Sequence, residues 1–147
     1  MTLNIRPLAR TDRQEWARLW TAYLAFYDTV LPAPHYDLAF DRLLSDDHHT
    51  PFCLIAQDGG TPCGLAHYLF HAHGWQAHDI CYLQDLFVDE TARGGGVGRA
   101  LIEHVAACAA QCGAGPVYWT TAQDNVTARA LYDKVAKKTP FIQYKLT

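Results

Sequence analysis

Apolar and polar positions along the chain follow two periods, one typical of strands and one typical of helices. Short apolar runs predict six strands, at residues 3–8, 51–57, 63–71, 80–88, 116–122 and 141–146. Helical spacing predicts four helices between them, at residues 16–27, 36–44, 101–112 and 125–138. Strands interleaved with helices indicate an α/β layered domain with a mixed sheet. Because no repeat or linker interrupts the pattern, we expect one domain over residues 1–147.

The composition narrows the functional classes. Half of the 147 residues are hydrophobic and 18% are charged, which is ordinary for a soluble globular domain. The formal net charge of −3 argues against a nucleic-acid-binding protein. No signal-peptide pattern or long apolar run is present, so neither export nor a membrane span is expected. Five cysteines without a CxxC motif are typical of reduced thiols, and we expect a cytoplasmic protein.

The segment RGGGVGR, residues 93–99, stands between the strand at 80–88 and a predicted helix. A glycine-rich turn before a helix offers free backbone N–H groups and the positive end of the helix dipole to an anion. The two flanking arginines, Arg93 and Arg99, can add charge-assisted hydrogen bonds to phosphate. A P-loop is excluded because no Lys-Ser/Thr pair follows the glycines, and the spacing does not match GxGxxG. A flexible structural turn remains an alternative.

The pattern Arg-x-x-Gly-x-Gly directly after YLQDLFVD resembles the acyl-CoA signature of the GNAT superfamily of N-acetyltransferases. IRPLARTD near the start and NVTARALYDKV near the end extend the resemblance over most of the chain. It implies a single-domain GNAT-like fold with a mixed, mostly antiparallel sheet flanked by helices and splayed at the acyl-CoA site. A bulge near Asp85 would splay the strand. The resemblance places the pantetheine arm of acetyl-CoA on Leu86, Phe87 and Val88, and the pyrophosphate on Arg93, Gly94, Gly95, Gly96, Val97, Gly98 and Arg99.

Asn125 and Tyr132 are separated by seven residues and so lie on one face of the last predicted helix. The resemblance implies that Asn125 contacts CoA and that Tyr132 protonates the departing thiolate. The alternatives are a plain helix N-cap for Asn125 and a core tyrosine for Tyr132.

The reaction needs a neutral amine, whereas an alkylammonium is neutral in only about one molecule per few thousand at pH 7. Asp85 is the carboxylate nearest to the expected pantetheine strand. Gln84 stands where the small-amine branch, typified by diamine acetyltransferases, carries a proton-relaying glutamate, and glutamine cannot act as a base. Asp85 or a chain of water molecules must then accept the proton. Alternation along a strand directs Gln84 and Asp85 to opposite faces unless a bulge intervenes.

The acceptor site has four further candidates. Tyr27 and Asp28 resemble part of the acceptor-site helix of the small-amine branch. Trp75 and Trp119 are candidates for lining the pocket, with core packing an equal interpretation for Trp119. No metal is expected, because the histidines at positions 71, 73 and 78 lack a completing ligand, and the pair at 48–49 is predicted to form a polar turn.

These observations predict an acetyl-CoA-dependent N-acetyltransferase that acts on a small primary amine by direct attack in a ternary complex. The alternative is a non-catalytic acyl-CoA-binding module that senses its ligand. The resemblance also implies a homodimer. We expect neither a nucleic-acid partner nor a membrane partner.

Overall fold

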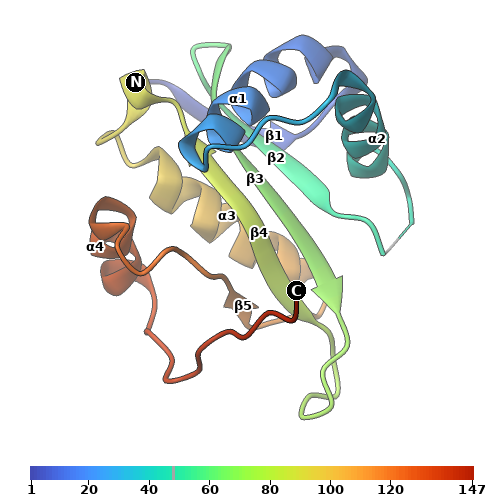
Figure 1. The fold of residues 1–147 in the computed structure, drawn as a ribbon, viewed down its shortest axis with the longest axis vertical. Helices are drawn as coiled ribbons and strands as arrows, with labels where there is room; N and C mark the ends of the chain where they lie inside the picture. The colour runs from blue at the N-terminus through green and yellow to red at the C-terminus, as the bar shows by residue number, and fades with distance from the viewer. Residues whose placement is uncertain (48) are drawn as a thin grey trace.

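The central sheet of the computed structural model, which describes residues 1–47 and 49–147, has five strands in the order β1-β2-β3-β4-β5. The first four pair antiparallel, and β5 runs parallel to β4 (Figure 1). This is the mixed sheet that the sequence pattern predicted, and it is mostly antiparallel, as the resemblance to GNAT enzymes implied. The strands are β1 (Leu3–Pro7), β2 (Phe52–Asp58), β3 (Thr61–His71), β4 (Ile80–Val88) and β5 (Val117–Tyr118).

Helices cover both faces of the sheet (Figure 1). Helices α1 (Arg13–Phe26) and α2 (Ala33–Leu43) pack on one face around Trp16 and Leu19. Helix α3 (Val97–Gln111) packs on the other face through Leu101 and Val105. Helix α4 (Val126–Val135) contacts the α3-side core through partly buried side chains. Among the helices that the structure describes, none is long and apolar enough to cross a membrane.

Strand β4 contains a bulge at Gln84. The pair His67–Asp85 is followed by the pair Tyr68–Leu83, so that β4 has one residue more than β3 at this point. Leu83 packs in the α3-side core, while Phe87, four residues later, packs in the α1-side core. Since residues separated by an even number normally share a face, the bulge inverts the alternation of the strand. The bulge expected near Asp85 is therefore present.

The sheet opens along the second half of β4. Strand β5 pairs with only Cys81 and Tyr82 of β4. Beyond this point, from Leu83 to Val88, no described strand pairs with the edge of β4 that faces away from β3. The splayed arrangement is thus confirmed, and it leaves main-chain groups of β4 available to a ligand that lies alongside the strand.

Two predicted strands are wrong or too long. Residues 141–146 are all described and form neither helix nor strand, and Phe141 and Tyr144 are 78% and 89% exposed. The predicted strand at 116–122 shortens to Val117–Tyr118. A strand requires hydrogen-bonding groups on a neighbouring strand. Because β5 has only two residues, residues 141–146 have no long strand to pair with at the β5 edge of the sheet.

The helices agree better with the expected ranges. Helix α2 begins at Ala33, three residues earlier than expected, because Pro34 occupies its first turn, where the fixed φ of proline fits a helix. Helix α4 ends at Val135, three residues before its predicted end.

Candidate active site

The glycine loop adopts a backbone shape that glycine favours. Gly94 and Gly96 have φ values of +82° and +81°, in the left-handed region, and Gly96 is the N-cap of α3. The first helical hydrogen bond runs from the Ala100 N–H to the Gly96 carbonyl. Among the described residues, the N–H groups of residues 94–99 have no acceptor. The loop therefore presents free donors at a helix N-terminus, as an anion site requires.

The remaining glycine and the two arginines frame this loop. A Cβ on Gly98 would lie 3.3 Å from Leu131 of α4, so that the glycine lets α3 approach α4 closely. The Arg93 Nε donates to the Val88 carbonyl at 3.1 Å, which holds this side chain at the end of β4. Arg99 forms an exposed ion pair with Glu103. Exposed pairs of this kind contribute only about 0.3–0.5 kcal/mol, so Arg99 remains free to bind phosphate.

A narrow cleft opens at the bulge of β4. Four elements meet there: β4, the last turn of α1, the segment after β5, and α4. All of the lining side chains are uncharged in their ordinary state at neutral pH. They are Tyr23, Tyr27, Leu83, Gln84, Leu86, Trp119, Thr120, Thr121 and Tyr132. The structure thus brings together five residues predicted from the sequence: Tyr27, Gln84, Leu86, Trp119 and Tyr132.

Helix α4 presents Tyr132 to this cleft. The helix begins after Asn125, whose Oδ1 accepts a hydrogen bond from the Ala128 N–H at 3.3 Å, as expected for an N-cap. The Tyr132 ring meets Trp119 edge-on, with 5.4 Å between ring centroids. Trp119 therefore both packs and lines the cleft. Burial, followed by the nearby Tyr27, raises the pKa of Tyr132, which keeps its hydroxyl protonated at neutral pH, as a proton donor requires.

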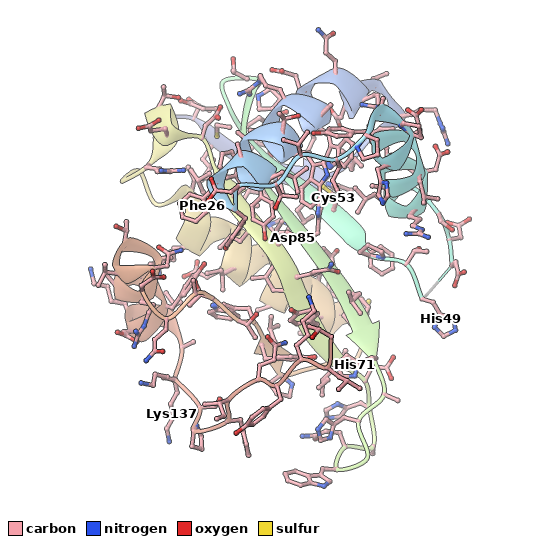
Figure 2. The ribbon with its side chains drawn as sticks, viewed as in Figure 1. Phe26, His49, Cys53, His71, Asp85 and Lys137 are labelled. Atoms are coloured by element: carbon pink, nitrogen blue, oxygen red, sulfur yellow. The ribbon has the colours of Figure 1, made fainter. Side chains whose placement is uncertain are left out.

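Asp85 does not line the cleft; it lies on β4, below α1 in the view of Figure 2. Its Oδ1 accepts a hydrogen bond from the Tyr23 hydroxyl at 2.8 Å, and its Oδ2 lies 3.0 Å from Nδ1 of His67. The Asp85 side chain is 11% exposed. Alternation does not hold at this point because the bulge intervenes: its extra residue, Gln84, is exposed in the cleft, whereas Asp85 is not among the lining residues.

Tyr23 and His67 were missed by the sequence analysis. His67 is one of two buried polar residues in the described structure, 4% exposed. The signal was a histidine in the interior of the apolar run of residues 63–71, which ends in a second histidine, and an interior position predicts a buried and hydrogen-bonded side chain. Tyr23 falls within the helix predicted at residues 16–27, and nothing in that pattern singles it out.

Two predicted substrate residues lie outside the cleft. Trp75, in the connection between β3 and β4, is 86% exposed, and its ring contacts His73. Asp28 is exposed just beyond α1 and has a left-handed φ of +53°. Among the described residues, no group of three or more His, Cys, Asp or Glu could hold a metal ion. Of the predicted histidine turn, residue 48 lies outside the described residues.

The site combines a bulged strand with an open edge, a glycine loop at a helix N-terminus and a tyrosine hydroxyl in the cleft. This combination is typical of an acyl-CoA-dependent transferase. The chain belongs to the acetyltransferase (GNAT) family, whose model matches residues 16–136. It is 38% identical over 143 residues to the D-amino-acid N-acetyltransferase HPA3 of Saccharomyces cerevisiae, covering 96% of this chain and 88% of the yeast protein. The protein is therefore an N-acetyltransferase enzyme.

Solved structures share the fold. The aminoglycoside N-acetyltransferase AAC(6')-Iy in complex with CoA superposes with a TM-score of 0.85 at 19% identity, over 99% of this chain and 94% of that one. The ribosomal-protein-alanine N-acetyltransferase from Brucella melitensis biovar Abortus 2308 gives a TM-score of 0.82 at 19% identity, over 100% and 99% of the two chains. The family and the CoA-bound neighbour support acetyl-CoA as the co-substrate.

Proposed function

We propose that this enzyme transfers the acetyl group of acetyl-CoA to a small primary amine by direct attack within a ternary complex. The observation that carries the proposal is the cleft in which the bulge of β4, the aromatic end of α1 and Tyr132 of α4 meet. Three elements that are far apart in the sequence are thus arranged around one cleft.

Acetyl-CoA occupies the open edge of β4 in this proposal. The free N–H groups and arginines of residues 93–99 bind the pyrophosphate. The unpaired edge along Leu86, Phe87 and Val88 binds the pantetheine arm, and Asn125 contacts it from α4. A backbone N–H near Leu86 stabilises the oxyanion of the tetrahedral adduct. Tyr132 then donates its proton to the sulfur as the C–S bond breaks.

The acceptor enters from the opposite side of the cleft, between Tyr27, Gln84 and Trp119. The cleft is narrow and is lined by side chains of four elements, which suits a small molecule rather than a folded protein. The hydroxyls of Thr120 and Thr121 offer hydrogen bonds to a polar group beside the amine. Since the yeast relative is a D-amino-acid N-acetyltransferase, amino acids are the first acceptors to test, followed by diamines and aminosugars.

The test is acetyl-CoA-dependent release of thiol with a panel of amines, which includes D- and L-forms of the same amino acids. We expect saturable turnover with one class of small amine and none with a folded protein acceptor. Calorimetric titration with CoA accompanies the assay. Tight binding of CoA without thiol release for any amine would contradict the proposal and favour the acyl-CoA-binding module.

We also propose a cytoplasmic homodimer. The apolar side chains near the C-terminus support the dimer, because Ile142 and Leu146 are 77% and 101% exposed in the single chain. The reduced thiols support the location, because the cysteines of the structure are free and three of them are buried. Light scattering coupled to gel filtration should give twice the chain mass for the wild type and the chain mass for the double variant Ile142→Asp, Leu146→Asp. A wild-type monomer would contradict the dimer.

A further inference from the structure

A chain of four hydrogen-bonded side chains runs from the α1-side core to the wall of the cleft. The Trp16 indole N–H donates to Nε2 of His67 at 3.1 Å. Nδ1 of His67 lies 3.0 Å from Oδ2 of Asp85, and Oδ1 of Asp85 accepts from the Tyr23 hydroxyl at 2.8 Å. Tyr23 lines the cleft, whereas Trp16 is fully buried.

The direction of each hydrogen bond follows from the chemistry of the groups. An indole N–H can only donate, so Nε2 of His67 is an acceptor. A neutral imidazole with an accepting Nε2 carries its proton on Nδ1, and it donates that proton to Asp85. Trp16 thereby fixes the tautomer of His67, and both oxygens of Asp85 are left as acceptors.

Among the described residues, no Arg or Lys side chain pairs with the carboxylate of Asp85. The titratable groups that face it are Tyr23 from α1, His67 from β3 and Cys53 from β2. Asp85 is therefore the carboxylate that a proton passing through the Tyr23 hydroxyl would reach.

Tyr23 cannot itself act as the base, because its hydroxyl does not ionise at neutral pH. Burial, together with the charge of Asp85 and the hydrogen bond to it, raises the pKa of Tyr23 well above its ordinary value. Its hydroxyl remains protonated and serves as a conduit rather than as a base. The ring is held in place by stacking on Trp20, with 5.2 Å between ring centroids.

We propose that Asp85 is the acceptor of the proton from the substrate amine, that the Tyr23 hydroxyl carries the proton across, and that His67 is the positioning residue that holds Asp85. This inference rests on the proposed function. It explains how the amine is deprotonated although the residue that lines the cleft at this point, Gln84, cannot act as a base.

In this step the bound ammonium gives one proton to the Tyr23 oxygen while the Tyr23 hydroxyl proton passes to Oδ1 of Asp85. The N–H bonding pair stays on nitrogen, which attacks the thioester carbon. As the C–S bond breaks, its electrons go to sulfur, which takes a proton from Tyr132. Tyr132 regains a proton from the second N–H of the new amide nitrogen. Asp85 later releases its proton to solvent through Tyr23, so that one proton is released per acetyl group transferred.

Tyr23→Phe and Asp85→Asn test the relay through the pH dependence of kcat/KM. Each variant should fall about 100-fold below the wild type at pH 7, on the scale of one lost general base. The deficit should shrink towards pH 10, because solution then supplies the neutral amine that the relay otherwise produces. Tyr36→Phe is the matched control. It removes a hydroxyl that bonds only to Thr21 in the described structure, and it should keep the wild-type profile.

His67 is tested with two variants that both leave the Trp16 indole N–H without its acceptor. In His67→Asn, the side-chain amide replaces Nδ1–H and can still donate to Asp85. In His67→Leu that donor is lost. We expect His67→Leu to show a deficit that shrinks with rising pH and His67→Asn to retain a wild-type profile. If both variants keep that profile, His67 has no positioning role.

The outcomes separate this inference from the proposed function. A wild type without turnover on any amine overturns the proposed function itself. A wild type with turnover, together with Tyr23→Phe and Asp85→Asn deficits that are the same at every pH, overturns the relay and leaves the function intact. Circular dichroism of each variant confirms that the comparison is made between folded proteins.

Discussion

The two halves of β4, on either side of Gln84, differ in their pairing with neighbouring strands and in the polarity of their surroundings. In the first half, Cys81 and Tyr82 pair with β3 and β5, and Cys81 and Leu83 are 0% and 2% exposed. In the second half, β4 pairs only with β3, and Asp85 lies in a polar network beside the cleft. One extra residue separates a closed, apolar segment from an open, polar one. The closed half supplies the rigid support that a binding site requires.

Deleting Gln84 should have the largest effect, because it removes the bulge that separates the halves. The pair Leu83–Tyr68 would then be followed directly by the pair Asp85–His67, so that Asp85 keeps its face while the cleft loses Gln84 and the distortion of β4. We expect no measurable acetyl transfer, with a free energy of unfolding close to that of the wild type. The thiol-release assay and urea unfolding measure the two. Gln84→Ala, which keeps the bulge, should retain most of the activity. A deletion variant as active as the wild type would contradict the role of the bulge.

Tyr132→Phe should have the next largest effect, because the open half of β4 meets Tyr132 across the cleft. We expect kcat to fall at least 10-fold and as much as about 1,000-fold, with little change in the KM for acetyl-CoA. Since burial raises the pKa of Tyr132 and the donor must be protonated, the wild-type kcat should not decline through loss of this proton until above about pH 10. Tyr144→Phe, at an exposed position, is the control. Unchanged turnover of Tyr132→Phe would exclude the acid role.

The burial of the closed half of β4 can be tested through the pH dependence of stability that is linked to Cys81. Burial raises the pKa of its thiol to about 12 in the folded protein, against about 8.5 in an unfolded chain. Stability linked to this group is therefore complete below about pH 8.5 and is lost as the pH rises towards 12. At pH 10 the loss amounts to about 2 kcal/mol. Cys81→Ala should thus lose about 2 kcal/mol less than the wild type between pH 7 and pH 10 in urea unfolding. Cys112→Ala, at an exposed position, should show the full loss. Equal losses for Cys81→Ala and the wild type would contradict the buried thiol.

The sequence predicted the parts of the fold that depend on local pattern. Strand β4 matches residues 80–88, and the glycine loop precedes α3 as expected. The bulge near Asp85 was implied by the resemblance to GNAT enzymes rather than by the residues. The contact between His67 and Asp85 joins two strands, and its register depends on the bulge, which no periodicity reveals. The strand expected at 141–146 failed for the related reason that its partner strand lies elsewhere in the chain and is too short.

The smallest expected effect comes from the two ends of α3. Gly96, before the helix, and Gly113, after it, have φ values of +81° and +69°, and a Cβ added to either would meet no atom within 4 Å. Alanine at each position should therefore cost a similar amount, about 1–2 kcal/mol, in the free energy of unfolding. Only Gly96 lies in the loop that we propose binds the pyrophosphate, so the KM for acetyl-CoA should rise about 3- to 10-fold in Gly96→Ala, on the scale of one weakened charged hydrogen bond. Gly113→Ala should leave that KM unchanged. Urea unfolding and initial-rate kinetics on the pair separate backbone strain from ligand binding, and an equal rise in KM for both would show that strain alone is responsible.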